Sequence, residues 1–218
     1  MSYFEHEREH RGSEAMRSLA AARVIVCGAG AIGANLCEGL ARVGVRQITV
    51  IDFDRIEERN LSTQPWGRRE LGQRKARMLG NRLHRELGVE PVALCDRLHS
   101  ENSVEILAGH DLIIDAFDNS ASRQAVQSAA RELAIPCVHA GMADGYGEVI
   151  WDEDYRVPMG EHEDLCDYPL ARALVTLVVG AALEISVQFL TEGVRRQASV
   201  TLRDLCMSSL TPRADSPS

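Results

Sequence analysis

Short apolar runs and longer amphipathic stretches alternate along most of this sequence. The apolar runs, such as RVIVC and DLIIDA, are typical of strands buried on both faces of a sheet. The longer stretches repeat apolar residues at helical spacing. The predicted strands are 23–27, 47–51, 89–95, 111–116, 136–140, 148–151 and 198–205, and the predicted helices are 3–21, 31–43, 74–87, 103–108, 120–133 and 168–190. This alternation predicts an α/β fold, Rossmann-like and doubly wound, with a mostly parallel sheet and helices on both faces.

The same pattern predicts how the chain is divided. We expect a single domain over residues 1–210, with an N-terminal arm at 1–22 and a helix-and-strand extension at 152–210. The polar end of the sequence, at 211–218, is expected to be disordered.

The most apolar stretch of the sequence, at 170–190, has about the length of a membrane-spanning helix. It carries Arg172, Glu184 and Gln188, and it lacks flanking basic asymmetry. A helix buried in the core or at a subunit interface is therefore expected, and no membrane association. Because little chain remains to cover such a helix in a monomer, we predict a two-fold homodimer.

Composition and charge exclude some classes of protein. The net charge of −8 over 218 residues argues against a broad basic surface, so no nucleic-acid partner is expected. The six cysteines are scattered, with neither C-x-x-C pairs nor zinc-finger spacing to histidine. Cys27 and Cys137 lie inside apolar strand-like runs, where a free cysteine behaves as a small hydrophobe, so we expect a reducing compartment. The first residues are charged and have no apolar core, so we expect no signal peptide and a cytoplasmic location.

A glycine loop follows the first predicted strand and leads into the first long helix after it. Gly28 permits a tight turn, Gly30 lets the backbone approach a phosphate, and Gly33 lets the helix pack closely on the sheet. The helix N-terminus then offers unpaired N–H groups to an anion. Asp52, which ends the second strand, is placed to accept hydrogen bonds from ribose hydroxyls. These features fit NAD, FAD or ATP.

Further polar residues follow the later strands, and each has a structural alternative. Asp54 is either functional or a solvated loop acid, and Lys75 is either a phosphate-binding cation or a surface lysine. Asp118 is either a Mg²⁺ ligand or the N-cap of the helix after it. The polar segment 60–64 and Lys75 have no purpose in a dehydrogenase, whereas a nucleoside triphosphate accounts for them.

Taken in chain order, these motifs resemble the ubiquitin-activating-enzyme-like ThiF/MoeB/HesA family of adenylyltransferases. The matching segments are GAGAIG at 28–33, GVRQITVIDFD at 44–54, NLSTQ at 60–64, GQRK at 72–75, DAFDN at 115–119 followed by Arg123, and Pro136 with GYGEV at 145–149. The resemblance covers roughly residues 12–151. It implies that the domain binds Mg²⁺ and ATP and adenylates the C-terminal Gly-Gly carboxylate of a ubiquitin-like or sulfur-carrier protein, releasing pyrophosphate.

The resemblance also implies roles for individual residues. The residues carried over to nucleotide binding are Gly28, Gly30, Gly33, Asp52, Asp54, Asn60, Gln64, Lys75 and Asn119. Lys75 and Asp118 are implied as catalytic residues, with Asp118 as the ligand of Mg²⁺. Cys166 lies where some relatives place a sulfur- or thioester-accepting cysteine. Its acidic neighbours would raise the pKa of a thiol, so an incidental role is favoured over a catalytic one.

The sequence departs from the family pattern at several points. The family usually has N-L-x-R-Q, and Thr63 stands at the position of that arginine, with Arg59, Arg68 and Arg69 nearby. Many members also supply an arginine from an N-terminal segment of the second subunit, for which Arg8 and Arg11 are the loose candidates here. The two C-x-x-C pairs of many bacterial members are absent. Met142 and Tyr146 are expected either to line a groove for the Gly-Gly tail or to pack in the core.

Three hypotheses therefore stand. The first is the adenylyltransferase. The second is a scaffold or regulatory member of the same family that has lost adenylation, for which the absent arginine at Thr63 is the reason. The third and weakest is an NAD-dependent oxidoreductase, which leaves Lys75 and Asp118 without a role.

Overall fold

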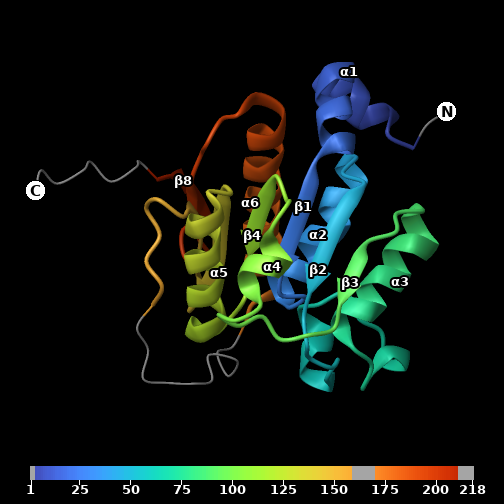
Figure 1. Cartoon of the computed structure of the whole chain (residues 1–218), viewed down its shortest axis with the longest axis vertical. Helices are drawn as coiled ribbons and strands as arrows, with labels where there is room; N and C mark the ends of the chain where they lie inside the picture. The colour runs from blue at the N-terminus through green and yellow to red at the C-terminus, as the bar shows by residue number, and fades with distance from the viewer. Residues whose placement is uncertain (1–2, 159–169, 211–218) are drawn as a thin grey trace, which may run out of the picture.

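The computed structural model describes residues 3–158 and 170–210 (Figure 1). The helices are α1 Glu5–Ala21, α2 Ala31–Val43, α3 Lys75–Leu87, α4 Ser103–Leu107, α5 Ser120–Leu133 and α6 Arg172–Glu192, with two 3₁₀ turns, η1 Glu58–Ser62 and η2 Arg68–Glu70. The strands are β1 Arg23–Cys27, β2 Gln47–Ile51, β3 Val92–Leu94, β4 Leu112–Asp115, β5 Cys137–Ala143, β6 Tyr146–Trp151, β7 Ala198–Thr201 and β8 Cys206–Ser209.

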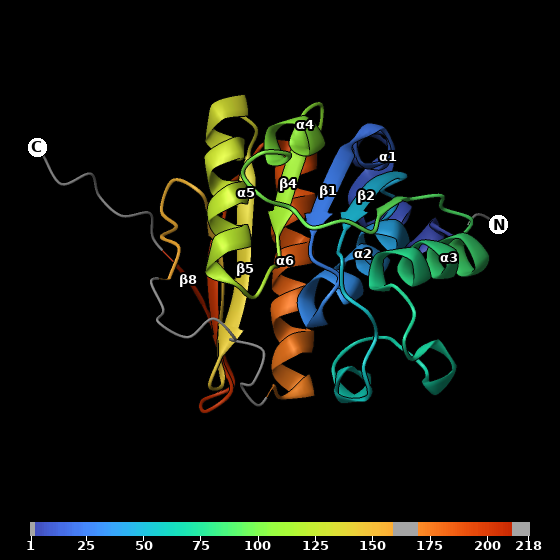
Figure 2. The same cartoon turned by 60° about the horizontal axis from the view of Figure 1, so that its bottom comes forward.

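All eight strands form one sheet in the order β3-β2-β1-β4-β5-β6-β7-β8. Figure 2 shows β5, β4, β1 and β2 side by side. The first five strands in this order pair in parallel, and β5 to β8 pair antiparallel. β5–β6 and β7–β8 are hairpins, whereas α6 lies between β6 and β7 in the chain. The predicted α/β, doubly wound, mostly parallel sheet is thereby confirmed. Because the chain winds outward in opposite directions from β1 and β4, the carboxyl ends of these two strands form the switch point where ligands bind in such folds.

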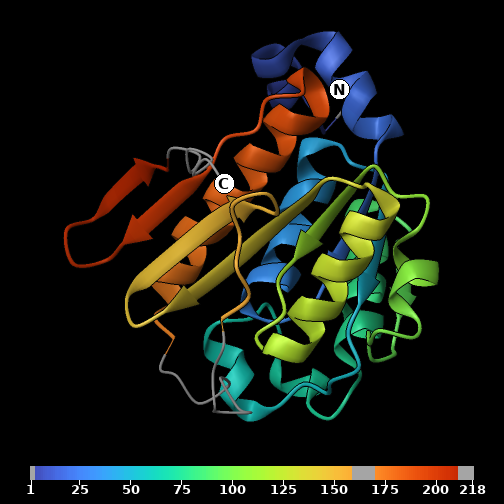
Figure 3. The same cartoon turned by 60° about the vertical axis from the view of Figure 1, so that its left-hand side comes forward.

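Helices cover both faces of the sheet, as the sequence predicts (Figure 3). Alternate side chains of each strand point to opposite faces, so Val24 and Val26 of β1 join one apolar cluster and Ile25 and Cys27 join the other. The first cluster lies under α2, α3 and α6, and the second lies under α4 and α5. The continuous apolar strands of the sequence are therefore buried on both sides.

The long apolar helix α6 packs against the sheet and against α1 and α2. Among the described residues it is the one helix long and apolar enough to cross a membrane by length and composition. Eight of its side chains are buried in the protein. It approaches β6 so closely that a Cβ at Gly147 would lie 2.2 Å from Val178 Cγ2. The predicted packing of this helix in the core is what the structure has.

Several predicted bounds were wrong. The predicted strand at 198–205 is too long, because β7 ends at Thr201 and a turn with Leu205 at a φ of 46° occupies 202–205. The strand after this turn, β8, lies beyond the predicted range. The turn contains the apolar residues Leu202 and Leu205, so its sequence pattern resembles that of a strand. β3 is shorter than predicted, whereas β5 and β6 are longer because they pair with each other along their whole length. Cys166 and the end at 211–218 lie outside the described residues.

Candidate functional site

The loops that follow β1 and β4 lie against each other at the switch point of the sheet. Ala116 N donates to Cys27 O at 2.9 Å, and Gly28 N donates to Ile51 O at 2.8 Å. Gly28 has a φ of +100°, and a Cβ on it would lie 3.0 Å from Ala116 O. Backbone conformation and close approach both require glycine here. The glycine loop and the segment 115–119 thus form one edge of a single site.

The other two glycines of the loop have different surroundings. A Cβ at Gly33 would lie 1.9 Å from Gly28 O, so α2 could not pack on the turn with a side chain at this position. Gly30 is the N-cap of α2, and a Cβ there would meet no atom within 4 Å. The space in front of Gly30 is therefore open, and the first N–H groups of α2 face it without a side-chain cap. This arrangement is a ready site for a phosphate.

The two glycines predict opposite outcomes for the same substitution. Gly33→Ala is expected to lower the free energy of unfolding by about 3 kcal/mol, because the backbone of Gly28 must move to relieve the overlap. Gly30→Ala is expected to fold like the wild type and to lose affinity for a triphosphate, since its methyl group occupies the approach to the helix N-terminus. Urea denaturation and nucleotide titration of both variants check this. Equal stability losses in the two variants would contradict it.

Asp52 ties the end of β2 to the glycine loop. Its Oδ2 accepts from Ala29 N at 2.6 Å, and its Oδ1 accepts from Asp54 N at 2.7 Å. The carboxylate is only 6% exposed, and burial raises the pKa of Asp52, with Lys75 opposing that shift. Each oxygen keeps a second lone pair, so a ribose hydroxyl is still able to donate to it. Asp52 thus has a structural contact at each oxygen in addition to its predicted ligand role.

Lys75 begins α3 and reaches back to the loop after β2. Its Nζ lies 2.9 Å from Asp54 Oδ2, and its backbone N donates to Asp54 O at 3.0 Å. The side chain is buried, which by itself lowers the pKa of Lys75, but the charges of Asp52, Asp54 and Asp118 raise it above its ordinary value. The structure therefore brings together four of the predicted residues, and Lys75 is a fixed cation rather than a mobile surface lysine.

The polar segment after β2 presents two side-chain amides. Asn60 Oδ1 accepts from Glu57 N at 2.9 Å in the capping box of η1, and Gln64 Oε1 accepts from Trp66 Nε1 at 2.7 Å. With both oxygens engaged, the amide nitrogens are left as donors. Within residues 3–158 and 170–210, neither nitrogen has a hydrogen bond to protein. Amide N–H groups of this kind are able to donate to phosphate oxygens.

The segment 115–119 assigns different tasks to its polar residues. Asn119 is the N-cap of α5, because its Oδ1 accepts from Ser122 N at 2.9 Å. Asp118 is exposed and does not cap the helix, so the capping alternative for Asp118 is wrong. Asn119 was predicted to bind nucleotide, and its side-chain oxygen is already used by the cap. Asp118 is exposed, and its negative charge contributes to raising the pKa of Lys75.

A buried network that the sequence did not reveal holds this segment in place. Asp115 is fully buried, and its Oδ2 lies 2.8 Å from His139 Nδ1 and 3.5 Å from Arg123 Nη1. Arg123 also donates to Tyr155 Oη at 2.9 Å, and the rings of His139 and Tyr155 stack at 3.9 Å. Burial alone would raise the pKa of Asp115, but Arg123 and His139 together lower it. The signal available beforehand was a histidine inside the apolar run PCVHA.

Because His139 is charged in the folded state, the free energy of unfolding is expected to fall as the pH becomes alkaline. Burial lowers the pKa of His139, but Cys137 and the carboxylates of Asp115 and Asp152 raise it from 6.5 to about 11. Because the folded pKa exceeds the unfolded value, the stabilisation is complete below pH 6.5 and is lost as the pH rises toward 11. One such group changes the free energy of unfolding by at most about 1.4 kcal/mol per pH unit.

We therefore expect urea midpoints of the wild type to fall between pH 6.5 and 9 more steeply than those of His139→Gln. The variant should be less stable than the wild type at pH 6 and closer to it at pH 9. Parallel pH profiles for the two proteins would contradict a charged His139 in the folded state.

Of the three arginines near Thr63, two have acidic partners, whereas Arg69 is exposed and forms no ion pair among the described residues. Arg59 Nε lies 2.7 Å from Glu57, and Arg68 Nη1 lies 3.2 Å from Glu58. In the arm, Arg11 makes a two-point ion pair with Glu184 of α6 at 2.8 and 3.3 Å. Arg11 therefore anchors α1 to α6 within its own chain.

The two residues considered for a Gly-Gly groove lie on opposite faces of the sheet. Met142 is partly buried and packs against the apolar cluster that includes α6, which favours the core-packing alternative for Met142. Tyr146 is 40% exposed, and its hydroxyl donates to Glu148 Oε2 at 3.1 Å. Tyr146 is therefore the more accessible of the two to a partner.

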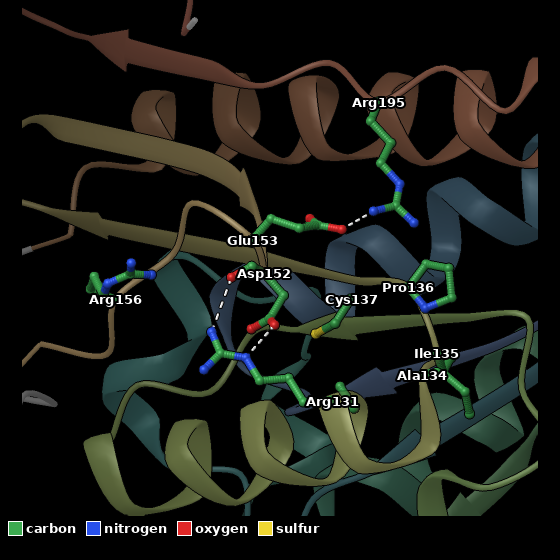
Figure 4. A pocket seen from close by; sticks show the side chains of 10 residues that line it. Arg131, Ala134, Ile135, Pro136, Cys137, Asp152, Glu153, Arg156 and Arg195 are labelled. Carbon is green, nitrogen blue, oxygen red and sulfur yellow. Dashed lines mark hydrogen bonds and ion pairs between the residues drawn. The ribbon is translucent and has the colours of Figure 1, made fainter. Parts of the chain in front are cut away.

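A cavity of about 560 Å³ lies away from this site, where β5 begins and β6 ends (Figure 4). Most of its charged side chains are already paired. Arg131 Nε lies 2.7 Å from Asp152, and Arg195 forms an ion pair with Glu153. Arg156 donates to a backbone carbonyl at 2.9 Å and has no acidic partner among the described residues. The cavity lies at the opposite end of the parallel strands from the candidate site.

The fold and site define a nucleotide-binding α/β domain. The chain belongs to the ThiF family, whose family model matches residues 6–162. It is 34% identical over 157 residues to the sulfur carrier protein adenylyltransferase of Thermus thermophilus, covering 66% of this chain and 57% of that protein. It is 30% identical over 145 residues to the molybdopterin-synthase adenylyltransferase of Salmonella typhimurium, covering 65% of this chain and 56% of that protein. The chain therefore spans little more than half the length of these relatives.

A solved structure shares nearly the whole fold. The crystal structure of E. coli MccB with ATP matches with a TM-score of 0.81, covering 97% of this chain and 72% of that chain. The sequence identity is 15%, so this likeness shows the fold alone. The similarity extends beyond the segment that the family model matches and includes the hairpin strands of the extension.

Proposed function

We propose that this protein is an ATP-dependent adenylyltransferase that activates the C-terminal Gly-Gly carboxylate of a ubiquitin-like or sulfur-carrier protein. The observation that carries the proposal is the meeting of a glycine loop, Lys75 and Asp118 at one end of the sheet. A triphosphate needs a helix N-terminus and a fixed cation, and both are present. The curated relatives that the chain matches are named adenylyltransferases, which supports the same activity.

The residues divide the task of positioning ATP. The open N-terminus of α2 at Gly30 and the buried Lys75 hold the phosphates. Asp52 accepts a hydrogen bond from a ribose hydroxyl. The amide nitrogens of Asn60 and Gln64 donate to phosphate oxygens. The carrier carboxylate then attacks the α-phosphorus, and the bond from that phosphorus to the bridging oxygen breaks to release pyrophosphate. Such a displacement needs positioning and charge stabilisation more than covalent chemistry.

Asp118 fits a Mg²⁺ ion that arrives with ATP. Within the described part of the chain, no three His, Cys, Asp or Glu side chains are grouped as a metal site. Mg²⁺ does not require such a group, because it commonly takes one or two carboxylates and fills its remaining positions with phosphate oxygens and water. The ion, when bound, would neutralise charge on the phosphates. The exposed carboxylate of Asp118 is placed to hold it.

We also propose that the protein acts as a two-fold homodimer in the cytoplasm. α6 carries exposed small residues, Ala173, Thr176 and Gly180, on the side turned away from the sheet. A second subunit is the simplest cover for this side. The scattered cysteines, of which Cys27, Cys37 and Cys137 are buried as free thiols, support a reducing compartment.

The proposal is tested by ATP–pyrophosphate exchange with carrier proteins that end in Gly-Gly, and with the same carriers lacking the last glycine as controls. Exchange that requires the intact terminus is expected. ATP binding with no exchange on any carrier would favour the scaffold or regulatory alternative. Binding of NAD in preference to ATP in a thermal-shift comparison would overturn the proposal.

A further inference from the structure

Arg172, the first residue of α6, reaches the position where the family motif has lost its arginine. Its Nη1 donates to the carbonyl oxygen of Thr63 at 2.6 Å and to Asn35 Oδ1 at 3.2 Å. Asn35 Nδ2 in turn donates to Thr63 O at 3.1 Å and to Ala31 O at 2.7 Å, in the first turn of α2. A chain of hydrogen bonds therefore joins Arg172 to the helix N-terminus that faces the phosphate site.

The guanidinium of Arg172 keeps both its charge and most of its donors. Among the described residues its hydrogen-bond partners are neutral oxygens, and it makes no ion pair. Only Nη1 is engaged, while a guanidinium has five N–H donors in a planar fork that matches phosphate oxygens. The side chain is exposed. The guanidinium is thus held through Nη1, and the N–H groups of Nε and Nη2 are available to a ligand.

The site itself needs another cation. Asp52, Asp54 and Asp118 place three carboxylates beside Lys75, whose ammonium is already in contact with Asp54. Arg59 and Arg68, on the same polar segment as Thr63, are offset by glutamates. Even when Mg²⁺ accompanies it, a triphosphate brings net negative charge to these three carboxylates, and Lys75 alone does not neutralise that charge.

We propose that Arg172 binds the β- and γ-phosphates of ATP in place of the arginine that is absent at Thr63. The inference rests on the proposed function, because it names a further ligand residue of the same site. In this arrangement the cation comes from the start of α6 rather than from the segment after β2. Its fork stabilises the charge that builds on pyrophosphate as it leaves.

The test compares nucleotides that differ only in their terminal phosphates. Arg172→Gln keeps a donor for the Thr63 carbonyl but loses the charge. It is expected to weaken binding of ATP and of inorganic pyrophosphate about 10- to 100-fold while leaving AMP affinity unchanged. Arg172→Lys, which keeps the charge but not the fork, should lie between. Arg42→Gln, an arginine at the far end of α2 that pairs with Glu38, is the matched control and should match the wild type.

A relocation experiment separates phosphate binding from a purely structural role. Thr63→Arg is expected to restore ATP affinity in the Arg172→Gln background and to change it little in the wild type. Thr63 is buried, so thermal unfolding of each variant is followed alongside. If the Thr63 variants do not fold, the contrast between ATP and AMP in Arg172→Gln decides the matter.

The possible results separate a failure of the role of Arg172 from a failure of the proposed adenylyltransferase function. A wild type that binds neither ATP nor pyrophosphate would overturn both. A wild type that binds ATP, with Arg172→Gln binding it equally well, would overturn only the role of Arg172. Equal losses for ATP and AMP would also overturn it, because they would mean that Arg172 merely pins α6 to the loop. Loss in Arg68→Gln instead would assign the cation to η2.

Discussion

The Asp118→Asn variant is expected to lose ATP–pyrophosphate exchange by about 100- to 1,000-fold, the range found when one group that stabilises transition-state charge is removed. Asparagine keeps the shape of the side chain and removes the charge that would hold Mg²⁺. Because Asp118 is exposed and does not cap α5, its thermal unfolding should stay close to that of the wild type. The loss should be largest at low Mg²⁺ and smaller at high Mg²⁺.

Exchange is measured over a Mg²⁺ series, with unfolding followed by circular dichroism. Asp204→Asn, an exposed aspartate in the turn between β7 and β8, serves as the matched control and should leave the exchange rate unchanged. Full exchange by Asp118→Asn at limiting Mg²⁺ would exclude Asp118 as the metal ligand. The metal would then have to be held by another carboxylate, with Asp54 the nearest candidate in the cluster.

Asp115→Asn, three residues earlier in the same motif, should behave in the opposite way. The substitution removes the carboxylate between two buried cations, Arg123 and His139, and leaves their charges uncompensated. Removing one partner of a buried ion pair typically costs about 3–5 kcal/mol, so a large loss of stability is expected. Chemical denaturation measures it directly.

Exchange by the fraction of Asp115→Asn that remains folded should be reduced only as far as the loop carrying Asp118 has moved. A saturating carrier and ATP should recover part of the stability, because ligands bind the folded state. If Asp115→Asn were as stable as the wild type, the network around His139 would not be what holds this loop.

The family resemblance implied a role for one of the two aspartates of DAFDN and none for the other. The resemblance assigned a role to Asp118 because the family has a ligand there, and the exposed position at a strand end agrees with that role. It said nothing of Asp115, whose partner His139 is 24 residues away in the chain. Their meeting depends on the register of β4 against β5, in which Asp115 lies opposite His139. No local pattern contains that register.

The alternation of apolar and polar residues was sufficient for the α/β class and for most helix and strand positions. This is because burial on two faces requires continuous apolar strands, and helix packing requires the 3.6-residue repeat. The glycine loop was predictable for a similar reason. The overlap at Gly33 and the positive φ at Gly28 are backbone requirements that only one residue type meets. The hairpin β7–β8 was missed because its turn carries apolar residues.

The sequence by itself thus determined which segments form the sheet and which residues are suited to hold a nucleotide, since both are matters of local backbone and side-chain chemistry. Only the tertiary structure decided that Lys75 is clamped by Asp54, that Asn119 caps α5, and that Arg172 lies on the carbonyl of Thr63. Thr63 and Arg172 are 109 residues apart. Their contact follows from the packing of α6 on α2. The local sequence around Thr63 or Arg172 does not predict which distant segments pack together.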